Sequence, residues 1–435
     1  MNLAQIKKKE LERIKPDDIS VKNIKKIVEG FSEELKKQLM AQGHEPQIFV
    51  GGSFAKGTLI KKDKYDVDLF VRFDWRYDNI SEALEKALKK VCMKLKIGYE
   101  KIHGSRDYFR VYSGENFYIE VVPVAKISRP QGARNVTDLS YFHVAYVKRK
   151  IKGLENEAII AKRFLQAQKV YGAESYVHGF SGYAVECLIV YYKKFEKMLS
   201  SLAKAKPEKR LVIDLEKHYK KNEVFFDMNE SKLHSPVILV DPTFKERNAL
   251  ASLSHETFER FQKAARAFLK KPSLKFFADR EIDTEALNKK AKKIKGEFVK
   301  LKISTDRQEG DIAGTKLRKF HYFMMGEMKK YFKIISEEFE YSGKKSAYVF
   351  LVVKSLGEIE RIGPPLKYNG KKEKKFMEKH IEAFREQHKN AYEKSGYLRA
   401  KIKVDFTARE FLEDWAKKNK AKMNEMGVVG MRVLS

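Results

Sequence analysis

Two aspartates separated by one residue, Asp66 and Asp68, lie in a short run whose pattern predicts a β-strand. Side chains at positions i and i+2 of a strand point to the same face, so both carboxylates are expected on one side of it. Adjacent like charges are unfavourable unless a cation offsets them, and paired carboxylate oxygens suit Mg²⁺ that also holds substrate phosphates. The pair therefore predicts metal-assisted phosphoryl or nucleotidyl transfer.

A glycine–serine turn, Gly51 to Ser53, precedes the two aspartates and continues into the first turn of a predicted helix. Such a turn presents backbone N–H groups and a hydroxyl to a phosphate, and Lys56 adds a positive charge beside it. Further along the chain, Glu120 interrupts the apolar run FYIEVVPV. A charged residue in such a strand is seldom buried unless it is paired or binds a metal, although Glu120 could also lie on a solvated edge. Beside the turn and the aspartates, we interpret Glu120 as a third acidic site residue.

The charge balance points to a polyanionic partner. The 435 residues include 90 Lys and Arg against 59 Asp and Glu, a formal net charge of +31. Such an excess favours nucleic acid as the partner. A lysine-rich, heat-adapted surface is the alternative, but that habit usually adds Glu in step with Lys. The length predicts two to four domains.

The cysteines and the apolar runs indicate the cell compartment. Cys92 and Cys187 lie in apolar helical patterns, which predicts a reducing compartment without structural disulfides. The start of the chain lacks a secretory apolar region, and no run approaches a membrane span. We therefore expect a soluble, cytoplasmic protein with no membrane partner.

The elements that must position these residues follow from periodicity. Predicted helices and strands alternate up to about residue 130, which indicates an α/β layer. A continuous helical pattern follows from 142 to about 192, which predicts an all-helical second domain that ends near Lys270. A second alternation follows from 297. The expected elements are helices at 20–42, 81–96, 317–339, 371–392 and from 408, and strands at 47–50, 108–112, 117–124, 297–303, 347–356 and 397–406.

The glycine–serine turn, the Asp-x-Asp strand and the third carboxylate resemble the nucleotidyltransferase superfamily. Four further blocks are similar, in order and spacing, to the archaeal-type (class I) CCA-adding enzymes, a family of tRNA nucleotidyltransferases, and the similarity covers nearly the whole chain. These blocks are IKGLENEAIIAKRFLQAQKVYGAE (151–174), GFSGYAVECLIVYY (179–192), VDPTFKERNALASLS (240–254) and IERIGPP (359–365).

The resemblance implies a multidomain protein of α/β and α+β class. It implies a nucleotidyltransferase head with a mixed sheet over residues 1–142 and a helical nucleotide-binding central domain over 143–268. A C-terminal α/β RNA-binding region would span 269–435, and the basic helix at 371–394 is expected to contact the RNA backbone.

The resemblance also assigns site residues. It implies that Asp66, Asp68 and Glu120 hold Mg²⁺, with a two-metal site expected. The residues that it implies for the nucleotide are Gly52, Ser53, Lys56, His143, Lys162, Tyr171 and Arg247, the last recognising the incoming base. The chain departs from the family twice, since the family usually has Asp at position 120 and Arg at position 56. Glutamate shifts the carboxylate, and lysine loses bidentate phosphate geometry.

The implied reaction is attack of the tRNA 3′-hydroxyl on the α-phosphate of CTP or ATP, which adds C, C and A to the acceptor end and releases pyrophosphate. A homodimer formed through the C-terminal strands is compatible with the sequence. Three alternatives stay open: a poly(A) polymerase, a 2′-5′ oligoadenylate synthetase, and a catalytically impaired RNA-binding homologue, for which Glu120 is the best support.

Overall fold

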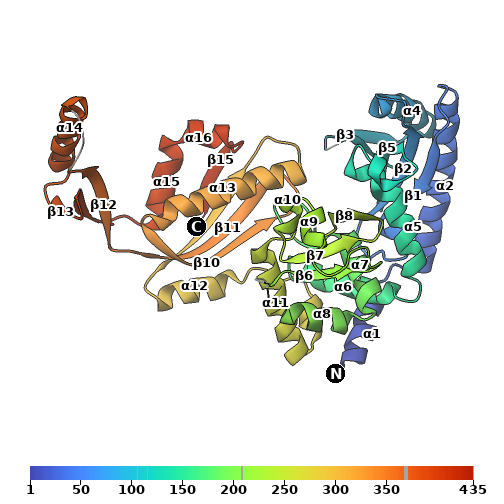
Figure 1. Ribbon diagram of the computed structural model, residues 1–435, viewed down its shortest axis with the longest axis horizontal. Helices are drawn as coiled ribbons and strands as arrows, with labels where there is room; N and C mark the ends of the chain where they lie inside the picture. Colours follow the sequence, from blue (N-terminus) through green and yellow to red (C-terminus); the bar gives the residue numbers. More distant parts are fainter. Residues whose placement is uncertain (105, 115, 207–208, 367–370, 435) are drawn as a thin grey trace. The chain divides into compact units, whose positions relative to one another are not determined.

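The structure, a computed structural model, describes residues 1–104, 106–114, 116–206, 209–366 and 371–434. The chain divides into two compact units, Met1–Arg280 and Glu281–Ser435, and the expected mixed α/β, multidomain class is confirmed (Figure 1). The predicted head and central domains both lie in the first unit, and the boundary predicted between them at residues 142 and 143 stays a prediction. Within the described residues, no helix has the length and apolarity needed to cross a bilayer.

The head is built on a five-stranded mixed sheet with the strand order β1-β2-β5-β4-β3. Val67 and Leu69 of β2 alternate with the two aspartates and pack with residues of α2 and α4 in one apolar core, as period-2 and period-3.6 patterns require (Figure 1). This core leaves the opposite face of β2 and β5 for polar side chains. The head elements are α1 Leu3–Ile14, α2 Asp18–Met40, β1 Gln47–Val50, α3 Gly52–Ala55, β2 Tyr65–Asp74, α4 Ile80–Leu95, β3 Gly98–Ile102, β4 Tyr108–Tyr112 and β5 Phe117–Lys126.

The central region packs its helices around a cluster of buried phenylalanines, among them Phe164, Phe195 and Phe268. The sequence pattern predicts an all-helical domain here, and this is wrong. A three-stranded sheet, β6-β7-β8, lies within it. The elements are α5 Ser140–Lys150, α6 Glu155–Ala167, α7 Gly182–Tyr192, α8 Phe195–Lys204, β6 Leu211–Asp214, α9 Val224–Asp227, α10 Glu230–Leu233, β7 Val237–Asp241, β8 Phe244–Asn248 and α11 His255–Lys270, with short 3₁₀ turns at Pro130–Gly132, Val136–Leu139 and Leu274–Phe277.

Strand β7 explains the error. All five of its residues are buried, with Val237 and Leu239 in the main central core and Ile238 and Val240 in a second cluster on the other face. A strand buried on both faces shows no polar alternation, so it cannot be told from a short buried helix by periodicity.

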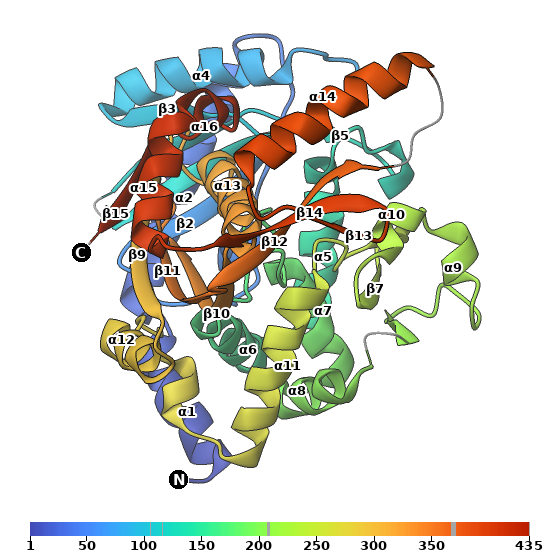
Figure 2. The same ribbon diagram turned by 90° about the vertical axis from the view of Figure 1, so that its left-hand side faces the viewer.

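The second unit contains a four-stranded antiparallel sheet of order β10-β11-β9-β15. Helices α13 and α15 cover one face, and α12 lies on the other (Figure 1). A smaller sheet, β12-β14-β13, packs with the basic helix α14 (Figure 2). The elements are α12 Thr284–Lys293, β9 Glu297–Ser304, α13 Asp311–Lys329, β10 Phe332–Tyr341, β11 Ser346–Ser355, β12 Glu358–Pro365, α14 Lys371–Gln387, β13 Tyr392–Lys394, β14 Tyr397–Lys403, α15 Ala408–Lys418, α16 Lys420–Glu425 and β15 Gly430–Leu434.

The helix expected over 317–339 is partly wrong, because α13 ends at Lys329 and residues 332–341 form β10. The register of β10 against β11 shifts between Ile334 and Ser336, so Ile335 is an extra, bulged residue. A bulge switches which alternate residues face the core. The core-facing residues therefore change from Phe332 and Ile334 before the bulge to Phe339 and Tyr341 after it, so the strand lacks one continuous period of two.

Replacing Phe320 by Ala tests whether the second unit has its own core. Phe320 is fully buried in α13 near Phe323 and Trp415, so the cavity should lower the free energy of unfolding by about 3–5 kcal/mol. Hydrogen exchange should show lost protection in β9 and β11 but unchanged protection in β2 and β5. Ile312→Ala, at an exposed position of the same helix, should have little effect. Equal loss of protection in both units would contradict separate cores.

Candidate active site

The three predicted acidic residues share one face of the head sheet. Strands β2 and β5 are parallel neighbours, and Asp68 is the register partner of Glu120, while Asp66 pairs with Tyr118. Paired positions of adjacent strands point to the same side, so tertiary structure brings all three side chains onto the face opposite the apolar core. The sequence predicted this juxtaposition.

Two of the three carboxylates, those of Asp66 and Glu120, each form an ion pair with a cationic side chain. Asp66 accepts from Lys62 Nζ at 2.5 Å, and Glu120 accepts from Arg110 Nη2 at 3.0 Å. Arg110 is the register partner of Glu120 on β4. Among the described residues, no ion pair joins Asp68. Burial, together with the charges of Glu120 and Asp66, raises the pKa of Asp68 to about 7.

The donor set fits a divalent cation. Within the described part of the chain, no three His, Cys, Asp or Glu side chains are arranged to hold a metal ion, and Asp66 and Glu120 each form an ion pair. Yet Asp68 is a half-buried carboxylate with two others beside it, and its ionised form is disfavoured first by desolvation and then by the charges of Glu120 and Asp66, which the protein does not fully compensate. A hard cation bound by carboxylate oxygens would supply that compensation.

The glycine–serine turn lies directly against Asp68. Gly51 N–H donates to the Asp68 carbonyl at 2.8 Å, and the short helix α3 begins at the next residue. Gly52 has φ +61°, and a Cβ there would lie 1.7 Å from Asp68 Oδ2. Only glycine permits this approach. Ser53 follows in the first turn of α3, where backbone N–H groups lack intrahelical partners.

Both predicted lysines converge on a carboxylate that the sequence interpretation left unassigned, Glu186 of α7. Lys56 Nζ donates to its Oε2 and Lys162 Nζ to its Oε1, each at 2.6 Å. Lys162 also donates to Thr58 Oγ1 at 2.8 Å, and the Thr58 hydroxyl donates to Glu186 Oε1 at 2.6 Å. Burial alone would raise the pKa of Glu186, but Lys162 and Lys56 lower it to about 2. This Glu186 network joins the loop after α3 to helices α6 and α7.

A second buried carboxylate, Asp241, organises His143 and Arg247. Its Oδ2 lies 2.9 Å from His143 Nε2 and accepts from Arg247 Nη1 at 2.7 Å, while Oδ1 accepts from the Tyr183 hydroxyl at 2.9 Å. The His143 and Tyr183 rings stack with centroids 4.0 Å apart. Burial would raise the pKa of Asp241, yet its hydrogen bond with His143 and the charge of Arg247 hold it low. The structure thus fixes both predicted side chains.

Tyr171 lies next to the Glu186 network. It pairs with Phe180 through an isolated β-bridge, and a Cβ at Gly182 would lie 2.7 Å from its hydroxyl and 4.0 Å from Lys162 Cε. Burial raises the pKa of Tyr171, with smaller contributions from Glu186 and Asp66. The phenol therefore stays protonated and can donate a hydrogen bond.

A cavity of about 460 Å³ adjoins the Asp241 cluster. Arg247 lines it together with two other cations, Arg134 and Lys232, and with Asn135 and Phe244. Cations with one aromatic and several small apolar side chains suit a ligand that has both a flat ring and a phosphate. Sequence reasoning predicted Arg247 but neither Arg134 nor Asn135.

Glu186 and Asp241 are two buried carboxylates of the site that sequence interpretation missed, and both left a signal. Glu186 interrupts the longest apolar run of the chain, and Asp241 ends the apolar run VILVD. A charge inside such a run is seldom buried without partners. The sequence could not name those partners, because they come from other elements.

Replacing Asp68 by Asn tests the uncompensated charge. Because folding raises its pKa from 3.8 to about 7, the ionised carboxylate disfavours the fold, and stability is lost as pH rises between these values. In chelator-treated protein at pH 8, Asp68→Asn should therefore raise the free energy of unfolding by about 2–4 kcal/mol, and the gain should vanish near pH 4. Calorimetry measures both.

Magnesium should stabilise the parent protein but not the Asp68→Asn variant. Millimolar Mg²⁺ should raise the Tm of the parent protein and leave that of Asp68→Asn unchanged. Asp78→Asn, at a position 89% exposed, is the matched control and should behave like the parent. A parent Tm that ignores Mg²⁺ would argue against a metal site here.

Replacing Glu186 by Gln tests the lysine network. The change leaves the buried Lys162 ammonium without its counter-charge, so unfolding should become easier by about 3–5 kcal/mol at pH 7. Because folding lowers the pKa of Glu186 from 4.5 to about 2, this difference should shrink as pH falls through that interval. Glu196→Gln, which removes a partly exposed partner of Lys7, should cost under about 1 kcal/mol. Denaturant titrations compare the two, and equal losses would refute a special role.

Two family models match parts of the first unit. Residues 1–140 match a family model described as a second messenger oligonucleotide or dinucleotide synthetase domain, and residues 156–278 match the second domain of tRNA nucleotidyltransferases. The Cid1 RNA terminal uridylyl transferase superimposes with a TM-score of 0.50 at 12% identity, over 64% of this chain and 98% of that one. At this identity the likeness shows the fold alone.

Curated relatives give the family. The chain is 45% identical to the CCA-adding enzyme of Nanoarchaeum equitans over 218 residues, which are 49% of this chain and 53% of that protein. Identity to the Methanosarcina mazei enzyme is 28% over 394 residues, 88% of this chain and 81% of that one. For the Saccharolobus islandicus enzyme it is 31% over 310 residues, 70% and 67% of the two chains. The acidic strand pair, the glycine turn and these relatives together show that the chain belongs to the archaeal CCA-adding enzymes, the class I tRNA nucleotidyltransferases.

Proposed function

We propose that the first unit binds CTP or ATP and transfers the nucleotide to the 3′-hydroxyl of tRNA, adding C, C and A with release of pyrophosphate. In this proposal Asp66, Asp68 and Glu120 hold Mg²⁺. The main support for this proposal is the strand register that places Asp68 beside Glu120, together with the close approach of Gly52 to the Asp68 carboxylate. When bound, the metal ions would stabilise negative charge on the attacking oxygen and on the leaving phosphates.

The Glu186 network supplies the triphosphate contacts. An ammonium group has three N–H donors. Lys162 uses two of them, on Thr58 and Glu186, and Lys56 uses one, on Glu186, so one and two donors are left for phosphate oxygens. Ser53 and the N–H groups of its turn, Tyr171 and the metal-bound carboxylates would surround the same phosphates. The lysines are held before the substrate arrives, which lowers the ordering entropy of binding.

The Asp241 cluster would contact the rest of the nucleotide. Asp241 holds Arg247 at 2.7 Å and leaves most of its guanidinium N–H groups for the ligand in the 460 Å³ cavity. His143 is kept neutral, because burial lowers its pKa against the opposing effect of Asp241. A neutral imidazole and a guanidinium offer the donors and acceptors needed to select the amino edge shared by cytosine and adenine.

There are two ways in which Glu120 could ligate a metal ion. Its carboxylate could leave Arg110, or it could bind the metal ion while keeping the ion pair with Arg110. Its carboxylate lies 3.0 Å from Arg110 Nη2, and the pKa of Glu120 is raised by burial while Arg110 opposes this. The glutamate side chain is one methylene longer than the aspartate usual in the family, so its carboxylate extends further from the β5 backbone. For the whole protein we infer tRNA as the macromolecular partner and the cytoplasm as its compartment, and a homodimer stays a prediction.

Incorporation into tRNA that lacks its 3′ end tests the function. The parent protein, offered labelled CTP and ATP singly and together, should add two C with CTP alone and C, C and A with both. Sequencing of the products reads the order. Asp68→Asn should abolish incorporation and leave tRNA affinity within about twofold, because the substitution removes a proposed metal ligand but no positive charge.

Other reaction products would indicate one of the alternative functions. Extension by A alone would indicate a poly(A) polymerase, and oligoadenylates formed without tRNA would indicate an oligoadenylate synthetase. Retained tRNA binding without addition would indicate the impaired homologue. Near-normal incorporation by Asp68→Asn would refute the metal assignment while leaving the CCA reaction standing.

A further inference from the structure

The second unit contains a split βαββαβ arrangement. Its order along the chain is β9, α13, β10, β11, α15 and β15, with the small β12-β14-β13 sheet and α14 inserted before α15. In space the strands run β10-β11-β9-β15, all antiparallel. Sheets of this kind have two helices on one face and can bind single-stranded RNA on the other.

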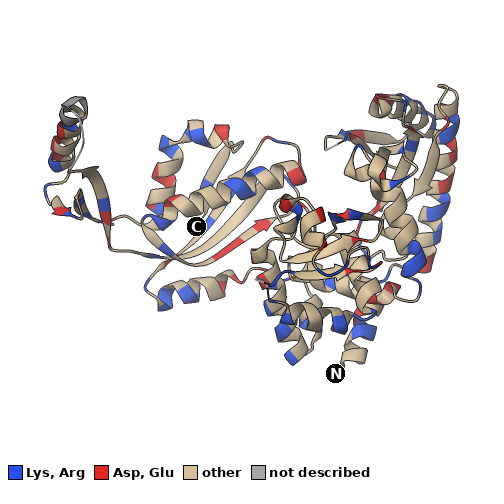
Figure 3. Cartoon of the chain, viewed as in Figure 1, with Lys and Arg blue, Asp and Glu red and all other residues tan. Residues whose placement is uncertain are grey.

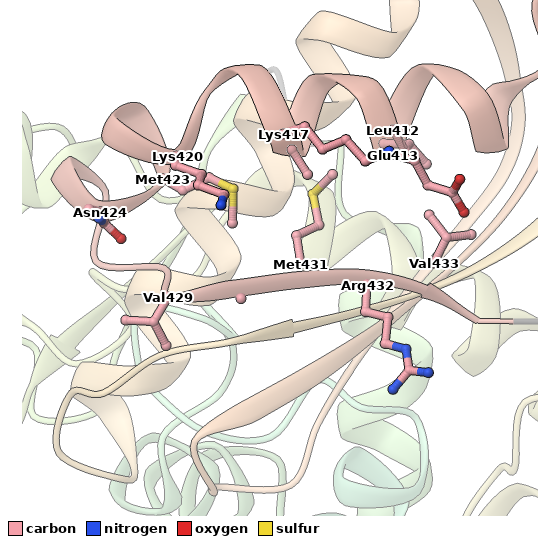
Figure 4. A pocket seen from close by; sticks show the side chains of 12 residues that line it. Leu412, Glu413, Lys417, Lys420, Met423, Asn424, Val429, Met431, Arg432 and Val433 are labelled. Atoms are coloured by element: carbon pink, nitrogen blue, oxygen red, sulfur yellow. The ribbon is translucent and has the colours of Figure 1, made fainter.

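The two faces of this sheet differ sharply in chemistry. Val299, Leu301 and Ile303 of β9 face the apolar core with α13 and α15. The alternate residues Lys300 and Lys302 face the other way. Figure 4 shows the same alternation on β15, where Met431 and Val433 point towards α15 and α16 and Arg432 points to the opposite side.

Register places an aromatic residue among these cations. Lys302 of β9 pairs with Tyr348 on one side and with Arg432 on the other, so the three side chains share the second face. The Tyr348 ring centroid lies 5.3 Å from Lys300 Nζ and 5.9 Å from Lys302 Nζ. Tyr348 and both lysines are half-buried, and Arg432 is exposed. Phe350 is 4% exposed, which leaves Tyr348 as the aromatic of this group that a ligand can reach.

Acidic residues and α12 limit this surface. Glu338 and Glu340 of β10 pair with Phe350 and Tyr348, so they lie on the same face at the far edge, where Figure 3 shows red along β10. Helix α12 packs on β9 and β11, and Lys290 donates to the carbonyl of Ile335 at 3.5 Å. The cationic half therefore follows β9 and β15.

We propose that the Tyr348 surface, made of Lys300, Lys302, Tyr348 and Arg432, binds a single-stranded stretch of the tRNA substrate. A base would stack on the Tyr348 ring, and the three cations would contact the flanking phosphates, as in other sheets that bind single strands. The charge of the surface is complementary to RNA, and the acidic edge on β10 sets the side along which the strand cannot run. The inference rests on the proposed function for the identity of the RNA, but the surface lies outside the nucleotide site.

Affinity of the full chain for labelled tRNA lacking its 3′ end, and for a uridine dodecamer, tests this surface. Tyr348→Ala should weaken both about tenfold, whereas Tyr348→Phe should stay within twofold because the ring remains. The double variant Lys300→Gln, Lys302→Gln should also weaken binding and reduce the slope of log affinity against log salt by about 1.4. Glu338→Gln, on the same face, and Lys417→Gln, on α15, are matched controls and should not weaken binding.

Several outcomes would overturn the proposal: Tyr348→Ala within twofold of the parent, Tyr348→Phe as weak as Tyr348→Ala, or an equal loss for a blunt RNA duplex. The last would indicate contact with duplex RNA instead. Thermal melting of each variant identifies misfolding, and the lysine variants keep the test open if Tyr348→Ala unfolds. At saturating tRNA, every variant should incorporate CMP at the parental rate. If the parent itself adds nothing to tRNA, the proposed function fails, while the uridine dodecamer still tests the surface.

Discussion

Two buried carboxylates, Glu186 and Asp241, hold the cations of the candidate site in place, and the rest of the site depends on them. Each is fully inaccessible to solvent and accepts from several donors, and each draws those donors from different elements. A buried anion is costly unless it is paired, and equally a buried lysine is costly without an anion. The carboxylate and its cations are therefore stable only together, in one arrangement.

Helix α7 connects these two centres. It carries Tyr183, which donates to Asp241, and one turn later Glu186, which accepts from both lysines. Residues three apart lie on neighbouring positions of one helix face. A displacement of α7 would therefore move the Glu186 network and the Asp241 cluster together, which couples the two parts of the proposed nucleotide site to one rigid element. The carboxylates of β2 and β5 stand apart from this balance, because their negative charge exceeds what Lys62 and Arg110 supply.

In each of the two units, one face of a sheet is apolar and the other face carries charged side chains. In the head, an apolar sheet face packs on α2 and α4, which leaves the other face for three carboxylates. In the second unit, an apolar face packs on α13 and α15, and the other face gathers lysines around Tyr348. In both cases the period of two along a strand separates the residues that stabilise the fold from the residues that we propose to bind a ligand. The acidic face suits a metal ion, and the basic face suits a polyanion.

By itself, the sequence determined the chemistry of the head. The glycine turn, the Asp-x-Asp strand and Glu120 are local patterns. Periodicity places the two aspartates on one face of a strand, and the resemblance adds Glu120 as the third carboxylate. Its blocks of similarity gave the family, which the relatives confirm. It failed where local pattern is ambiguous, at the doubly buried β7 and at the bulged β10.

Only the tertiary structure decided which charges meet. Glu186 and Asp241 look alike in sequence, as acids within apolar runs, and their partners are up to 130 residues away. It also decided that Glu120 pairs with Arg110 and that Lys300 and Lys302 flank Tyr348. The physical reason is that an ion pair or a stacked ring depends on distance in space, and strand register and helix packing set that distance through contacts that no local window contains.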